Sequence, residues 1–130
     1  MLLERKILVV EDNEINRAAL CAILSPQYTV LEAENGVQAL ALLEKYREGI
    51  SLILLDIVMP VMDGYEASRA IRDLKRADAK TVRIFACTAS TFAEDRNRAL
   101  ASGMDDFLSK PLNVTVMLQK LEAVRKGGAS

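Results

Sequence analysis

Short apolar runs alternate with amphipathic segments along the whole sequence. Five runs rich in aliphatic and β-branched residues predict strands at residues 6–10, 28–33, 52–56, 83–88 and 107–109. Helical spacing of apolar positions predicts five helices, at residues 14–24, 36–48, 65–74, 92–102 and 114–125. The alternation indicates βα units, and hence a parallel sheet covered by helices.

Capping and breaking residues mark the ends of several predicted helices. Asn13 and Asn113 are candidate N-caps for the first and last helices, because a short polar side chain can accept a hydrogen bond from a free amide of the first turn. Pro26 ends the first helix and Gly103 the fourth. Gly49 marks the end of the second helix.

Two helices carry apolar residues that share a face at helical spacing. In the first helix the expected face is Ile15, Ala18, Ala19, Ala22 and Ile23. In the second helix it is Val37, Leu40, Ala41 and Leu43. Both helices are therefore predicted to be amphipathic.

Length and composition indicate one globular domain. The chain has 130 residues, of which 51% are hydrophobic, and we expect a folded domain at residues 1–126 with a flexible tail at 127–130. No apolar stretch reaches the ~20 residues of a membrane-spanning helix, and residues 1–6 lack the apolar core of a secretory signal. We expect a cytoplasmic protein that does not associate with membranes.

Charge and the rarer residue types exclude several functions. With 17 basic and 18 acidic residues the net charge is −1, so we expect no direct binding of nucleic acid. Cys21 and Cys87 lack metal-ligand spacing and are predicted to lie in the core. The chain contains no histidine, which excludes histidine-based catalysis and phosphohistidine chemistry within this polypeptide.

Acidic residues end two of the predicted strands. Asp56 follows the apolar run 52–55, and the pair Glu11 and Asp12 follows the run 7–10. If these strands are parallel neighbours, the three carboxylates meet at the carboxyl edge of the sheet, where open α/β folds bind ligands. Their mutual repulsion, about 4 kcal/mol per close pair at an effective dielectric of ~20, requires a cation. Three oxygen donors suit Mg²⁺.

Two further polar residues fall at the ends of other strands. Thr88 ends the fourth strand and Lys110 follows the fifth. A hydroxyl, an ammonium and a metal around one carboxylate favour phosphoryl transfer. Asp56 would then be the nucleophile that forms an acyl phosphate, with Mg²⁺, Lys110 and Thr88 each stabilising one phosphoryl oxygen.

In this order and spacing, four segments resemble the receiver domains of two-component response regulators. They are ILVVEDN (residues 7–13), LLDIVMPVMDG (54–64), TA (88–89) and KP (110–111). The resemblance implies a flavodoxin-like, doubly wound sheet of five parallel strands in the order 2-1-3-4-5, with five helices. The resemblance also implies a cis peptide before Pro111, which is common in this family.

The same resemblance implies roles for individual residues. Asp56 would be the phosphoacceptor, and the metal ligands would be Glu11, Asp12, Asp56 and the backbone carbonyl of Val58. The phosphoryl group would come from a histidine kinase or a histidine phosphotransfer domain. Such a chain is a signalling phosphoacceptor with Mg²⁺-dependent self-phosphorylation, and not an enzyme with turnover.

Receivers of this kind also switch conformation. The resemblance implies that Phe107 moves inward when Thr88 is drawn toward the phosphoryl group, which reshapes the face of the fourth helix, fifth strand and last helix for a downstream effector. Val58 and Ser90 stand where residues influence water access. Neither carries an acid or amide, so we expect slow loss of the phosphoryl group.

Other functions remain open from the sequence. A flavodoxin-like FMN protein shares the fold, but the acidic residues 11–14 would repel its phosphate. A phosphatase of the haloacid dehalogenase class needs a second acid where Val58 stands. A pseudo-receiver would bind partners without phosphorylation, which the complete acidic, threonine and lysine set disfavours.

The type of receiver is less constrained. The chain could be a free-standing regulator, a phosphorelay intermediate or part of a larger protein. The stretches MDGYEA (residues 62–67) and FLSKPL (107–112) most resemble receivers attached to hybrid sensor histidine kinases.

Overall fold

The sheet has the predicted topology. The computed structural model describes residues 6–45, 50–57, 62–74, 82–89, 93–110 and 113–127. Within these ranges the strands are β1 (Lys6–Val10), β2 (Thr29–Ala33), β3 (Ile50–Asp56), β4 (Arg83–Thr88) and β5 (Asp106–Ser109). All neighbouring pairs are parallel, in the order β2-β1-β3-β4-β5. This is the order that the resemblance to receiver domains implied, and it is confirmed.

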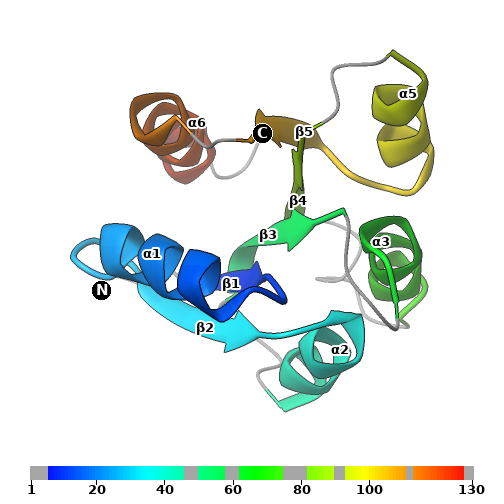
Figure 1. Ribbon diagram of the computed structural model, residues 1–130, viewed down its shortest axis with the longest axis horizontal. Coiled ribbons are helices and arrows are strands. Elements are labelled where there is room, and N and C mark those ends of the chain that lie inside the picture. Colours follow the sequence, from blue (N-terminus) through cyan, green and yellow to red (C-terminus); the bar gives the residue numbers. More distant parts are fainter. Residues whose placement is uncertain are drawn as a thin grey trace.

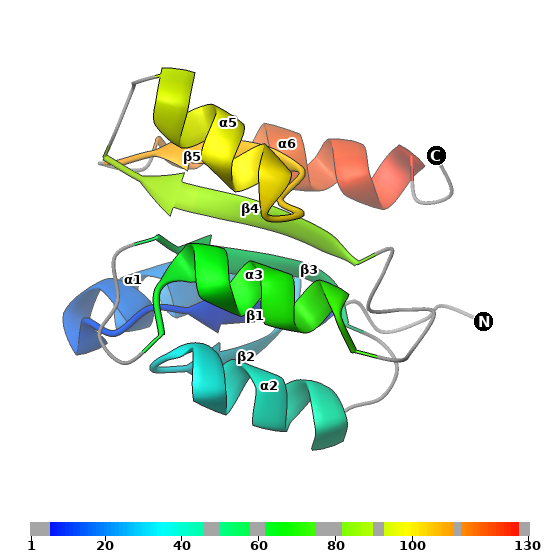
Figure 2. The ribbon, with the colours of Figure 1, turned by 90° about the vertical axis from the view of Figure 1, so that its right-hand side faces the viewer.

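Helices cover both faces of the sheet. They are α1 (Glu14–Leu24), α2 (Gly36–Lys45), α3 (Gly64–Arg72), α5 (Ala93–Ala101) and α6 (Val114–Gly127). Figure 1 shows α1 and α6 on one side of the sheet and α2, α3 and α5 on the other. The same two layers of helices are visible after a quarter turn in Figure 2. The predicted doubly wound, flavodoxin-like architecture is therefore confirmed.

The strands divide their side chains between two cores. In β3, Ile53 and Leu55 point into the core under α2, α3 and α5, whereas Leu52 and Leu54 point into the core under α1 and α6. Each of these side chains is almost fully buried, which contributes about 1.5–3 kcal/mol per residue. Cys87 lies in the α1/α6 core as predicted, whereas Cys21 is only half-buried.

The predicted buried face of α1 is wrong. All five residues of that face, Ile15, Ala18, Ala19, Ala22 and Ile23, are exposed. The buried residues are instead Arg17, Leu20 and Leu24. Every position from 18 to 24 is apolar, so helical periodicity alone did not fix the rotation of α1. Leu20 and Leu24 pack against the sheet, whereas the alanines and the equally large Ile15 and Ile23 are left outside.

The predicted face of α2 is partly right. Leu40 and Leu43 pack into the core under α2, α3 and α5, together with Ala39. Val37 and Ala41 are exposed. The buried stripe is rotated by about one position relative to the prediction.

Side-chain caps begin three helices near the carboxyl edge of the sheet. The predicted caps are confirmed: Asn13 Oδ1 accepts a hydrogen bond from the amide of Asn16 at 2.9 Å, and Asn113 Oδ1 accepts one from Val116 at 3.0 Å. Asp63 forms a capping box with Glu66 at the start of α3.

At the opposite, amino edge of the sheet, Arg72 joins three segments. Its guanidinium donates to the carbonyls of Val82 at 2.7 Å and Gly103 at 2.9 Å, and pairs with Asp105 at 2.9 Å. Gly103 has a φ of 95°, and a Cβ there would lie 2.7 Å from Arg72 Cγ, so this position requires glycine. The contacts tie the end of α3 to β4 and to the α5–β5 turn.

Some predictions fall on residues outside the described ranges. They concern Gly49, Val58, Ser90, the peptide before Pro111 and the tail residues 128–130. Gly127 is the last residue of α6. In the part of the chain that the structure describes, the helices are too short or too polar to cross a bilayer.

Candidate functional site

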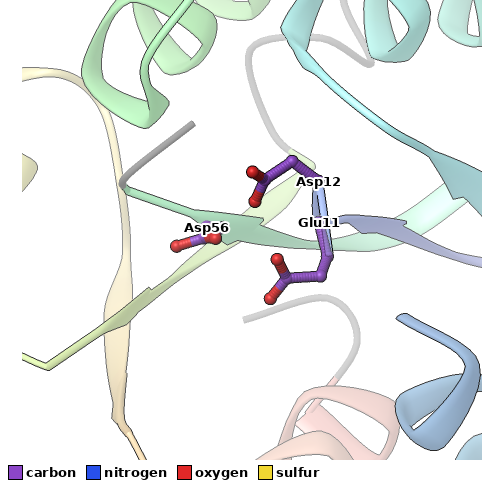
Figure 3. Close-up of side chains that lie close together, drawn as sticks. All are labelled: Glu11, Asp12 and Asp56. Carbon is purple, nitrogen blue, oxygen red and sulfur yellow. The ribbon is translucent and has the colours of Figure 1, made fainter. Parts of the chain in front are cut away.

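Three carboxylates meet at the carboxyl edge of the sheet. Glu11 and Asp12 directly follow β1, and Asp56 ends the neighbouring β3, where Val10 stands opposite Leu55. One carboxylate oxygen from each of the three acids lies within 4.8 Å of the others. Figure 3 shows the three side chains gathered at the two strand ends. The convergence predicted from the parallel strands is present.

Two of these acids are buried. Glu11 and Asp56 are 5% and 4% exposed, whereas Asp12 is exposed to solvent. Burial raises the pKa of Glu11, and the Asp56 charge adds to that effect. The Asn13 amide, which donates to Glu11 Oε2 at 3.0 Å, and the Lys110 charge oppose it. Positive charge is thus favoured beside this pair.

Lys110 supplies part of that positive charge. Its Nζ lies 2.9 Å from Asp56 Oδ1 and 3.7 Å from Glu11 Oε1. Burial lowers the pKa of Lys110, but the hydrogen bond and charge of Asp56, with the charge of Glu11, outweigh it and raise that pKa overall. The ammonium therefore stays charged at neutral pH.

The end of β4 completes the site. Cys87 stands opposite Asp56, and the following residue, Thr88, is half-buried at the strand end. The carbonyl of Thr88 accepts a hydrogen bond from the Lys110 amide at 2.9 Å, so the backbones of the two residues are joined. Burial raises the pKa of Cys87 to about 12, which keeps this thiol neutral beside the carboxylates.

Close packing of α3 supports the acidic strand end. The Gly64 amide donates to the carbonyl of Ile57 at 2.9 Å. A Cβ on Gly64 would lie 2.6 Å from the carbonyl oxygen of Asp56 and 2.7 Å from Ile57 Cα. Only glycine fits against this backbone. Gly64 ends the motif at residues 54–64, but no local pattern in the sequence indicates this close approach.

Phe107 and Thr88 border the same narrow crevice. Its remaining lining residues are Ile57, Tyr65, Ala86, Asp95, Arg96 and Ala99. The guanidinium carbon of Arg96 lies 5.2 Å from the centre of the Phe107 ring, within range of a cation–π contact. Sequence reasoning missed Arg96, because a charged helical residue gave no sign of this contact.

The donor set fits a small, hard cation. Mg²⁺ prefers oxygen ligands at about 2.0–2.1 Å, which places neighbouring ligands about 3 Å apart and opposite ligands about 4 Å apart. The carboxylate oxygens of Glu11, Asp12 and Asp56 lie within 4.8 Å, so small side-chain adjustments or bound waters accommodate such an ion. Val58, the predicted fourth ligand, lies outside the described residues.

Comparison with known proteins places these features in a family. The sequence model of the response regulator receiver domain matches residues 7–122. The sensor histidine kinase RcsC of Salmonella typhimurium is 42% identical over 125 residues. That match covers 92% of this chain but 13% of RcsC, so the chain spans a small part of the relative's length.

Two solved receiver structures are similar throughout. The receiver domain of the sensor histidine kinase PA1611 from Pseudomonas aeruginosa, with magnesium coordinated in its active-site cleft, has a TM-score of 0.79 and 37% identity, covering 92% of this chain and 95% of that one. The receiver domain in the Saccharomyces cerevisiae Ypd1–Ssk1 complex has a TM-score of 0.81 and 34% identity, covering 92% and 88%.

The family model, which matches residues 7–122, includes the acidic residues, Thr88 and Lys110. The expected likeness to receivers of hybrid kinases is confirmed. The chain belongs to the response regulator receiver domain family.

Proposed function

We propose that Asp56 accepts a phosphoryl group from a phosphohistidine on another protein or on another domain of the same protein. The observation that carries this proposal is the contact of 2.9 Å between Lys110 Nζ and Asp56 Oδ1, beside two further carboxylates. The ion pair with Lys110 holds this buried carboxylate in place at the carboxyl edge of the sheet. The receiver family to which the chain belongs acts in two-component and phosphorelay signalling.

In the proposed reaction a carboxylate oxygen of Asp56 attacks the phosphorus. The bond from phosphorus to the donor's imidazole nitrogen breaks, and its electron pair returns to that nitrogen. Lys110 then neutralises one phosphoryl oxygen, and the Thr88 hydroxyl donates a hydrogen bond to another. Glu11, Asp12, Asp56 and the Val58 carbonyl would hold Mg²⁺, which when bound offsets negative charge on the phosphoryl oxygens.

The donor must lie outside this chain, because the sequence contains no histidine. Ile15, in the first turn of α1 and three residues after Asp12, is 80% exposed. It begins the apolar face formed by Ile15, Ala18, Ala19, Ala22 and Ile23, which is exposed along α1 beside the site. We assign this α1 face to the histidine-bearing donor, which has to cover the adjoining edge of the sheet to reach Asp56. Ypd1, a histidine phosphotransfer protein, has been co-crystallised with the receiver domain of Ssk1, its downstream response regulator.

The output surface in this proposal lies around Phe107. A groove between α5, β5 and α6 is lined by residues that include Arg96, Phe107, Asn113 and Lys120. When the Thr88 hydroxyl turns toward the phosphoryl group, Phe107 moves inward toward Thr88, and the other side chains of the narrow crevice that both residues border shift to admit the ring. Because phenylalanine has no hydroxyl, packing and the Arg96 contact control this movement. The downstream effector binds this groove after Phe107 has moved inward.

Within this proposal the chain is a receiver of a hybrid sensor histidine kinase. The share of RcsC that it covers, 13%, supports a receiver that works as one segment of a larger protein. A free-standing regulator is the alternative.

Replacing the acceptor tests the central assignment. With acetyl phosphate and Mg²⁺, the wild-type chain is expected to gain one phosphoryl group by intact mass, and Asp56→Asn none, because the amide is not a nucleophile. Chelating the metal with EDTA should also prevent the gain. Modification of the Asp56→Asn protein at the wild-type rate would assign the chemistry to another residue.

Two lysines provide a matched test of the ammonium. Lys110 and Lys120 each pair with an aspartate at 2.9 Å, but Lys120 pairs with Asp106, away from the acidic cluster. Lys110→Met is expected to slow phosphorylation by acetyl phosphate about a hundredfold, since it removes a preorganised charge from the transition state. Lys120→Met should leave the rate unchanged. Equal rates for the two variants would remove Lys110 from the mechanism.

The phosphorylated chain is expected to be long-lived. Neither Val58 nor Ser90 offers an acid or an amide to position a water for attack, so decay in Mg²⁺ at neutral pH should take many minutes or longer by intact mass. Val58→Asn, which introduces an amide, should decay faster. Loss of the phosphoryl group from the wild type within seconds would contradict this expectation.

A substitution on α1 tests docking of the protein donor separately from the chemistry at Asp56. Ile15→Asp is expected to slow phosphotransfer from a phosphorylated histidine phosphotransfer protein at least tenfold, since burial of an isoleucine contributes about 1.5–3 kcal/mol. Its rate with acetyl phosphate should not change. Leu100→Asp is the control, because Leu100 is 52% exposed near the far end of α5. An unaffected protein donor would show that docking occurs elsewhere.

A further inference from the structure

A third buried charge lies next to the acidic site. Among the charged residues that the structure describes, Glu11, Asp56 and Arg17 are buried, with Arg17 9% exposed. Glu11 and Asp56 belong to the candidate metal site, but Arg17 lies in α1 and has no role in the proposed chemistry. Burial of an arginine costs free energy unless its donors are satisfied, so the contacts of Arg17 show what it holds.

The principal contact of Arg17 is with the backbone of the acidic pair. Its Nη1 donates to the carbonyl oxygen of Glu11 at 2.8 Å, in a buried hydrogen bond. This carbonyl belongs to the peptide that links Glu11 to Asp12. On the other side, the Glu11 amide donates to the carbonyl of Ala33 at 3.0 Å. Glu11 is thus held by β2 through its amide and by Arg17 through its carbonyl, just beyond the end of β1.

Two glutamates hold the guanidinium in turn. Arg17 Nε donates to Glu32 Oε1 at 3.2 Å, and Nη2 lies 3.8 Å from Glu34 Oε1. Both glutamates lie at the end of β2 and are exposed. The planar guanidinium therefore has three partners on different sides, which limits its rotation. It links α1, the end of β2 and the peptide between the two acids.

We propose that Arg17 is a positioning residue of the metal site: it fixes the peptide between Glu11 and Asp12 and so sets where both carboxylates lie. This inference rests on the proposed function, because it assigns those acids to a divalent cation. Rotation of that peptide moves both side chains, since one acid precedes it and the other follows it. Groups that orient metal ligands typically contribute about 10- to 100-fold to metal affinity.

A pair of arginines separates positioning from general stability. Arg17 and Arg72 both donate to backbone carbonyls and pair with acids, but the partners of Arg72 lie at the amino edge of the sheet. Methionine keeps most of the apolar stem of either side chain and removes its donors. The variants Arg17→Met and Arg72→Met are therefore matched in chemistry and differ in position.

The measurement is Mg²⁺ binding by the full chain without any phosphodonor. Titration calorimetry gives the Kd, and amide NMR shifts of Asp12 and Asp56 report the site; thermal melts in EDTA report stability. Arg17→Met is expected to raise the Kd for Mg²⁺ about tenfold or more. Arg72→Met should lower the melting temperature and leave the Kd unchanged. An unchanged Kd in Arg17→Met, or an equal rise in both variants, overturns the proposal.

Lysine variants cover the case in which Arg17→Met does not fold. Arg17→Lys keeps the charge, but one ammonium replaces the fork and cannot hold the Glu11 carbonyl and both glutamates together. A severalfold rise in Kd, absent in Arg72→Lys, supports the proposal, and wild-type affinity overturns it. If the wild-type chain itself does not bind Mg²⁺, the proposed function fails together with this inference. If only the Arg17 variants bind normally, the proposed function stands.

Discussion

The ion pair between Lys110 and Asp56 is the interaction on which the rest of the site depends. Two buried carboxylates and a third beside them repel one another, and the ammonium offsets part of that repulsion. The partners come from β3 and β5, which are not neighbours, so the lysine has to reach across the end of β4. The hydrogen bond from the Lys110 amide to the Thr88 carbonyl fixes the backbone from which the lysine side chain extends. The strand order thus determines the electrostatics of the site.

The sheet and the convergence of its acids could be predicted from sequence because parallel topology leaves little freedom. Strands joined by helices all end at one edge, so residues such as Asp12, Asp56 and Lys110 must approach one another once the strand order is known. Caps such as Asn13 are equally local, since the acceptor lies three residues from its donor. The roles of individual atoms in phosphoryl transfer come from chemistry applied to this geometry.

The rotation of α1 and the surroundings of Arg17 could not be predicted in the same way. α1 has apolar residues around most of its circumference, so more than one rotation of the helix would bury an apolar face, and the observed one buries Leu20 and Leu24 and leaves Ile15 and Ile23 exposed. A charged residue such as Arg17 is expected to be exposed. Its burial depends on partners at the end of β2, such as Glu32, which lies 15 residues further along the sequence. No local pattern connects these partners to Arg17. The contact of Arg96 with Phe107 and the close approach of Gly64 to β3 are also tertiary, so no local pattern predicts them.

The Arg72 contacts at the amino edge have a consequence for how stability and chemistry are distributed in this fold. Arg72, Gly103 and Asp105 join segments at the end of the strands opposite to the carboxylates. Substitutions of Arg72, Gly103 or Asp105 are expected to change the free energy of unfolding while the carboxylates at the other edge keep their arrangement. In this fold, the residues that tie the segments together at the amino edge are therefore separate from the residues that would carry the chemistry at the carboxyl edge.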